Sequence, residues 1–205
     1  MANVKITDMT AATTPLAGTE LLEIVQSGVS VKAAAADIGN SANALPFASL
    51  SGRAYISAYD TSDQTGSTSA ATPVKMNTTA FSAGISVANN GSGVPTRITF
   101  AAAGTYMIAP SIQFKNTDTS DHDATVWFRK NGTDIANSAT ITSIPKAADG
   151  GAGFFQIVFY EQVTAGQYIE VMWLPENVGV TIDYTAAGAI APAIPSVITV
   201  SERIA

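Results

Sequence analysis

From about residue 54 to the end of the chain, short runs of β-branched and aromatic residues recur, and turn residues separate them. Such runs, bounded by Gly, Pro, Asn and Asp, are typical of β-strands, and no long helical apolar period competes with them. The pattern predicts an all-β sandwich. The predicted strands cover residues 54–60, 74–77, 84–88, 96–100, 105–115, 124–130, 133–140, 153–163, 167–174, 178–184 and 196–203.

One of the turns also predicts how neighbouring strands pair. Asn131 and Gly132 lie between two of the predicted strands, and both residue types accept the positive φ that a two-residue hairpin needs. A hairpin joins antiparallel strands, so we expect an antiparallel sheet.

The strand predicted over residues 153–163 has two faces, and neither is fully polar. One face carries Phe154, Gln156, Val158, Tyr160 and Gln162, and the other carries Phe155, Ile157, Phe159, Glu161 and Val163. An isolated sandwich needs only one apolar face per sheet, so we expect another subunit to cover the second. The alternative is that loops or the N-terminal segment of the same chain cover it.

Overall composition limits the partners. Hydrophobic residues make up 46% of the chain and charged residues 13%, which favours a folded protein. The net charge of -6 argues against nucleic acid, since such partners require clustered Lys and Arg. No run is long enough for a membrane span or has the pattern of a Sec signal, so we expect a soluble protein with no membrane partner.

The first part of the chain has a different pattern. Ser27-Gly28 lies between short β-prone runs at 21–26 and 29–32, which predicts a hairpin, and residues 33–38 are compatible with a helical turn. A unit this small needs a partner surface or its own copies to stay folded.

These patterns divide the chain into three parts. We predict an N-terminal attachment module over residues 1–40, a small and polar linker over 41–53, and a β-sandwich domain over 54–205.

Chemical sites are poorly supported by the residues available. The single histidine, His122, excludes His-rich metal sites and most His-based triads within one chain. A polar loop with Asp118, Asp121 and Asp123 around His122 offers oxygen ligands for Ca²⁺, but its spacing does not match an EF-hand, and a solvated loop is favoured. We therefore predict no catalytic, cofactor-binding or metal-binding residues, and a protein that is not an enzyme.

Large aromatic residues raise one further alternative. Trp127, Trp173 and Tyr184 could form a platform for a sugar, although aromatic residues in β-domains more often belong to the core or an interface. The favoured interpretation is core or interface.

Several motifs together resemble a known family. Residues 54–60, Gly104-Thr105-Tyr106, residues 126–133, residues 163–171 and residues 195–200 resemble, in order and spacing, a jelly-roll domain of the C1q and tumour-necrosis-factor (TNF) type found in virion proteins of tailed phages. The segment from Ile6 to Ile38 is similar to an N-terminal module of phage fibre and decoration proteins.

The resemblance implies a fold, an assembly and a location. It implies an antiparallel jelly-roll sandwich, a homotrimer, and a non-catalytic place on the capsid surface of the virion as a decoration or cement protein that binds the major capsid protein. A tail fibre or tail-tip knob that binds a host surface receptor or glycan is the alternative.

The residues expected to make these contacts are apolar. In a segment too short to bury its own apolar residues, we expect capsid anchoring by Leu16, Leu21, Leu22, Ile24 and Val25. From the strands with two mixed-apolar faces, we expect trimer packing by Phe154, Tyr160, Tyr168 and Met172.

Overall fold

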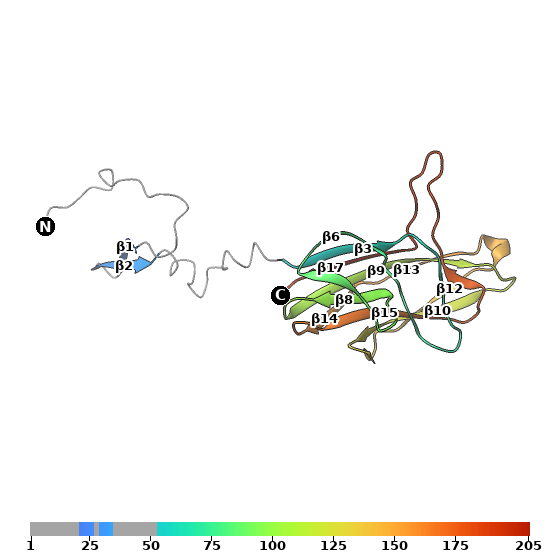
Figure 1. Cartoon of the computed structure of the whole chain (residues 1–205), viewed down its shortest axis with the longest axis horizontal. Helices are drawn as coiled ribbons and strands as arrows, with labels where there is room; N and C mark the ends of the chain where they lie inside the picture. Colours follow the sequence, from blue (N-terminus) through green and yellow to red (C-terminus); the bar gives the residue numbers. More distant parts are fainter. Residues whose placement is uncertain (1–20, 27–28, 35–52) are drawn as a thin grey trace. The chain divides into compact units, whose positions relative to one another are not determined.

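The structure is a computed structural model that describes residues 21–26, 29–34 and 53–205 (Figure 1). The chain divides into two compact units, Met1–Gly52 and Arg53–Ala205. In the first unit, β1 (Leu21–Gln26) pairs antiparallel with β2 (Val29–Ala34), which confirms the predicted hairpin. The helical turn predicted over 33–38 is wrong at its start, because Ala33 and Ala34 pair with β1, and its remainder lies outside the described residues.

The second unit consists of two antiparallel sheets. The seven-stranded sheet contains β5 (Thr72–Pro73), β7 (Ile85–Asn89), β8 (Pro95–Phe100), β10 (His122–Lys130), β11 (Thr133–Asp134), β12 (Thr140–Ile144) and β15 (Tyr168–Pro175). The eight-stranded sheet contains β3 (Tyr55–Asp60), β4 (Gln64–Thr65), β6 (Thr78–Ala83), β9 (Gly104–Asn116), β13 (Ala152–Gln156), β14 (Phe159–Val163), β16 (Val180–Ile182) and β17 (Val197–Arg203).

The order of the long strands is that of a jelly roll. Along the chain, β8, β10 and β15 belong to one sheet, while β9, the pair β13 and β14, and β17 belong to the other, so the chain crosses repeatedly between the sheets. Within the sheets, β9 pairs with β17, and β15 pairs with both β8 and β10. The predicted fold class, an antiparallel jelly-roll sandwich, is confirmed.

Side chains from both sheets meet in one core. Strand β9 alternates over much of its length and buries Tyr106, Ile108 and Phe114 among others. Aromatic pairs bridge the sheets: the ring centroids of Phe114 and Trp173 are 5.8 Å apart, and those of Phe100 and Tyr106 are 4.4 Å apart. These pairs hold β9 against β15 and β8.

The hairpin turn predicted at Asn131-Gly132 is present, with the positive φ angles expected for both residues. Asn131 and Gly132 have φ of 48° and 83°, and Lys130 lies opposite Thr133 in the ladder between β10 and β11. Positive φ at both central residues matches the right-handed twist of the flanking strands, which is why Asn-Gly suits this connection.

Two predicted strands are interrupted. The strand predicted over 133–140 ends after Asp134, because the buried Ser138 hydroxyl accepts the N–H of Phe128 and donates to the carbonyl of Ile135. The strand predicted over 153–163 breaks after Gln156 and resumes at Phe159. The break lies opposite Pro110 of β9, which has no N–H to donate.

Two further predicted strands differ from the structure. Residues 74–77 are not a strand; they connect β5 to β6, and they bury Val74 and Met76 in the core. The strand predicted over 178–184 shortens to β16. Among the described residues the one helix is the short 3-10 turn η2 (Ala147–Asp149), so no described helix is long and apolar enough to cross a membrane.

The core packing gives a first prediction. Trp173→Ala removes a fully buried indole that contacts Phe114, and we expect it to lower the free energy of unfolding by about 3–5 kcal/mol. Urea denaturation of the full chain measures this. Ile141→Ala is the control, since Ile141 is 65% exposed and its loss should cost less than about 0.5 kcal/mol. Equal effects of the two changes would contradict the proposed core.

Candidate interaction surface

The outer face of the eight-stranded sheet carries large apolar side chains that nothing in the described chain covers. They come from β3, β6, β13, β14 and β17, and they are Tyr55, Phe81 (61% exposed), Phe154 (54%), Tyr160 (55%), Ile198 and Val200. We call this set the apolar face. Isolated exposed apolar residues are ordinary, but six on one side of one sheet indicate a surface for interaction.

The period-two alternation of the strands places these residues. In β17, Val197 and Thr199 are buried while Ile198 and Val200 point outward. In β13, Phe155 lies opposite Ile112 and is buried in the core, so its neighbour Phe154 points to the outer side of the sheet.

Charge is nearly absent from this part of the sheet. Across the ladder, Ile198 lies opposite Ser111, Val200 opposite Ala109, and Tyr160 opposite Met107. On the outward positions of β9, β13, β14 and β17, the charged residues are Lys115, near one end of the sheet, and Glu202, which lies opposite Tyr55 and Met107 near the other end. The centre of the face therefore costs little to desolvate.

The outer face of the seven-stranded sheet has the opposite character. Arg129 Nε lies 2.7 Å from Asp134 Oδ1, and Arg97 Nε lies 3.6 Å from Glu170 Oε1. The Arg97 guanidinium also stacks 4.3 Å from the centre of the Tyr168 ring. The Arg129–Asp134 pair is partly exposed, as is typical of a hydrated surface. The Glu170 carboxylate is buried and also accepts the hydroxyl of Thr96 at 2.6 Å. The two sheets therefore differ in outer chemistry, and the apolar face is a specific feature of one of them.

The four residues predicted for trimer packing separate into two groups. Phe154 and Tyr160 lie on the apolar face. Tyr168 and Met172 lie in β15 of the other sheet, where Tyr168 stacks with Arg97 and Met172 is buried opposite Pro73 of β5. The structure therefore does not bring these four side chains to one surface.

The predicted anchoring residues belong to the first unit. Leu21, Leu22, Ile24 and Val25 lie in β1, and Leu16 lies outside the described residues.

In the polar loop considered as a Ca²⁺ site, the carboxylates of Asp118 and Asp121 bind other groups of the protein. Asp118 Oδ2 lies 3.0 Å from His122 Nε2, and Asp121 accepts the backbone N–H of Lys146 at 2.8 Å. The backbone N–H of Thr119, followed by the contact with His122, lowers the pKa of Asp118. Over residues 53–205, no three His, Asp or Glu side chains converge as metal ligands would.

The aromatic platform considered for a sugar does not form as a group. Trp173 is fully buried between the sheets, whereas Trp127 lies on the outer side of β10, where its indole N–H donates to Asp134 at 2.8 Å. Trp127 and Trp173 therefore cannot stack on one ligand.

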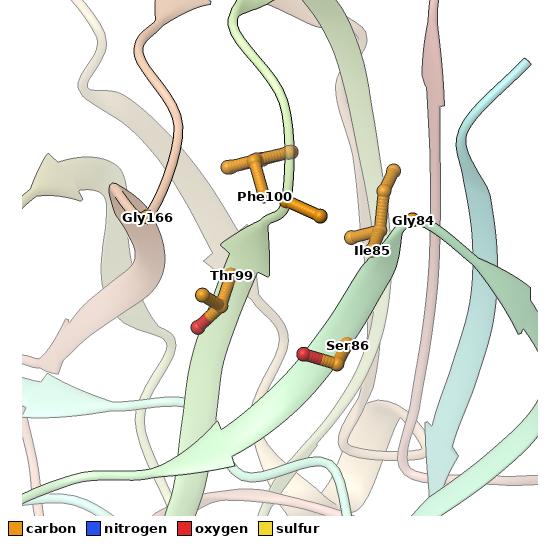
Figure 2. Close-up of a pocket in the computed structure, with 7 residues that line it drawn as sticks. Gly84, Ile85, Ser86, Thr99, Phe100 and Gly166 are labelled. Carbon is orange, nitrogen blue, oxygen red and sulfur yellow. The ribbon is translucent and has the colours of Figure 1, made fainter.

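A pocket of about 380 Å³ opens beside β7 and β8 (Figure 2). Its side chains are mainly apolar, with hydroxyl groups from Ser86 and Thr99, and its lining consists of Gly84, Ile85, Ser86, Thr99, Phe100, Ala101 and Gly166. These residues supply no carboxylate, imidazole or amine, so they offer no general acid or base.

Comparison with known proteins gives a likeness in fold alone. No family model matches the chain, and no curated protein is similar to it in sequence. Crystal structures of murine APRIL at pH 5.0 and pH 8.5 superpose with TM-scores of 0.45 and 0.43, at 8% and 9% identity. Each superposition covers 74% of this chain and 99% of the APRIL chain. The jelly-roll assignment rests on this chain's own strand order.

An acidic pair lies beside the end of β16. Asp63 Oδ1 accepts the backbone N–H of Tyr184 at 2.8 Å, which brings Asp63 close to Asp183. Burial, and then the negative charge of Asp63, raise the pKa of Asp183, and Lys115 opposes this in part. The folded state therefore disfavours the ionised form of Asp183.

This pair predicts a pH dependence. A raised carboxyl pKa destabilises the fold at pH values above it, and the penalty disappears once the carboxyl is protonated in both states. Asp183→Asn should therefore raise the urea midpoint at pH 7, and the gain should vanish below about pH 3.5. A gain that is equal at both pH values would show that charge is not the cause.

The apolar face predicts self-association. Tyr160→Glu places a charge at a contact that would be desolvated, so we expect the complex to weaken by about 2 kcal/mol or more. Sedimentation equilibrium measures this over a range of concentrations. Val178→Glu is the matched control, because Val178 is 68% exposed and lies in the turn after β15. Unchanged association of Tyr160→Glu would exclude this face.

Proposed function

We propose that the chain is a non-catalytic structural protein of a tailed-phage particle, a homotrimer that decorates and stabilises the capsid shell. The observation that carries the proposal is the apolar face of the eight-stranded sheet, with Phe81, Phe154 and Tyr160 more than half exposed. An exposed face with six large apolar side chains is typical of a protein that functions as an oligomer. The resemblance of the sequence motifs to phage jelly-roll domains favours a trimer.

The two-unit organisation supports an attachment role for the first unit. The described part of that unit is a two-stranded hairpin, and such a hairpin is marginally stable by itself in water. A partner surface would supply the missing packing. We propose that Leu16, Leu21, Leu22, Ile24 and Val25 make that contact with the major capsid protein.

Binding of this kind stabilises a shell by mass action. A ligand that binds only the assembled shell contributes about 2.7 kcal/mol per site at a hundred times its Kd. Three linked attachment units add avidity, because binding of the first raises the effective concentration of the others. A trimer therefore suits a threefold position on a capsid.

A tail fibre or tail-tip knob is the second candidate. The observation that favours it is the outer side of β10, where the Trp127 ring, Asp134 and Arg129 are joined by hydrogen bonds. An aromatic ring beside charged hydrogen-bonding groups is an arrangement that binds sugars. Binding on a glycan array that is lost in Trp127→Ala would favour this candidate.

The two candidates place the protein differently on a particle. Cryo-electron microscopy of the phage that carries this chain should show it at regular lattice positions on the shell. Copies confined to the tail would favour the knob instead.

The attachment role predicts the effect of a truncation. Removal of residues 1–40 should abolish binding to capsids while the remaining chain keeps its trimer. Co-sedimentation with capsids measures the first property, and sedimentation equilibrium measures the second. Capsid binding by the truncated trimer would contradict the assignment of the first unit.

A further inference from the structure

A long loop between β16 and β17 stands clear of the sandwich (Figure 1). We call residues 185–194 of this loop the finger. Its two limbs are joined at the base, where the N–H of Thr185 donates to the carbonyl of Ile194 at 3.0 Å and the N–H of Ile194 donates in return at 2.8 Å. Near the tip, the N–H of Gly188 donates to the carbonyl of Ala191 at 3.0 Å.

The finger has the composition of a buried segment although it is exposed. Residues 186–194 are Ala, Ala, Gly, Ala, Ile, Ala, Pro, Ala and Ile, without a single polar side chain. Ile190 is 100% exposed and Ile194 is 47% exposed. Surface loops ordinarily carry Asn, Asp and Ser, whose side chains bond to water or to their own backbone. A loop without such groups indicates a surface that another molecule covers.

The base of the finger is fixed to the eight-stranded sheet. The N–H of Asp183 donates to the carbonyl of Gln113 at 2.9 Å, and the N–H of Tyr184 donates to Asp63 Oδ1 at 2.8 Å. A fixed base sets where the finger emerges, which lowers the entropy lost when its tip binds.

The return limb of the finger leads into β17, which contributes two residues to the apolar face. Ile194, in the return limb, is followed along the same segment by Ile198 and Val200, which are exposed outward positions of β17. The finger and the apolar face are therefore connected through a single strand. This connection favours burial of both in the same assembly.

Charge argues against an anionic lipid surface as the partner. Asp63 and Asp183 lie at the base of the finger, and the whole chain has a net charge of -6, so an anionic lipid surface would repel it. The apolar face of another copy is uncharged at its centre and presents exposed aromatic rings, Phe154 and Tyr160 among them. Ile and Ala side chains lose water favourably against such rings.

We propose that the finger of each copy packs on the apolar face of a second copy of this chain. The contact is heterologous, because finger and face are different surfaces, and such contacts form a ring where the rotation between successive copies closes. The inference rests on the self-association in the proposed function and specifies which segment reaches across.

Substitution at the tip tests the finger directly. Ile190→Asp should raise the concentration at which the assembly dissociates by about tenfold or more, because an unpaired carboxylate would be desolvated in the contact. Ile141→Asp is the control, since Ile141 is exposed on β12 of the other sheet and should leave this concentration unchanged. Circular dichroism checks that both variants fold.

The outcomes separate the two proposals. A wild-type chain that is monomeric at all concentrations would overturn the proposed self-association itself. An assembled wild type with an unchanged Ile190→Asp variant would overturn the finger contact alone.

Crosslinking locates the contact, and the absence of cysteine in the chain makes it site-specific. Ile190→Cys is labelled with a benzophenone maleimide, mixed with isotopically labelled full-length chain lacking the probe, and irradiated. We expect crosslinked peptides that join the probe to labelled residues of β13, β14 or β17. Crosslinks confined to the probe's own copy would overturn the proposal.

Discussion

Aromatic packing between the two sheets is the interaction on which the rest of this structure depends. Phe114 of β9 meets Trp173 of β15, and Tyr106 of β9 meets Phe100 of β8, so the longest strand is held against two strands of the opposite sheet. Once these rings occupy the interior, the register of β9 is determined, because a shift by one residue would turn them to the outside. The neighbours of β9 take their own register from it.

The apolar face follows from that register. Because β13 pairs with β9, Phe155 lies opposite Ile112 and is buried, and Phe154 is left outside. The same alternation places Ile198 and Val200 outside in β17. These residues are exposed by the geometry of the sheet and not by a loose or poorly packed strand, so covering them needs packing from outside this sheet and not a rearrangement of the core.

The alternation of apolar and polar residues predicted most of the strands. It did not show which sheet each strand joins or where a strand is interrupted, because these depend on pairing between distant segments. Alternation identified the outward position of Phe154 and Tyr160, yet it placed Tyr168 and Met172 with them, because alternation does not show which sheet a strand joins. The interruption after Gln156 depends on Pro110, a residue of the paired strand far away in sequence. The finger was missed, although its signal was present: nine consecutive residues without a polar side chain, between two strands.

The edges of the sheets favour a face over an edge as the route of the proposed self-association. In the described part of the chain, β6 pairs with β3 alone and β7 with β8 alone, and both ladders contain a register shift. The edge formed by β13 and β14 is broken between them, and β11 and β12 are short and separate. Bulges and short strands hinder edge-to-edge addition, which would otherwise grow without limit. A largely apolar face beside interrupted edges therefore favours the proposed side-chain packing between copies, and packing of that kind can close into a finite ring.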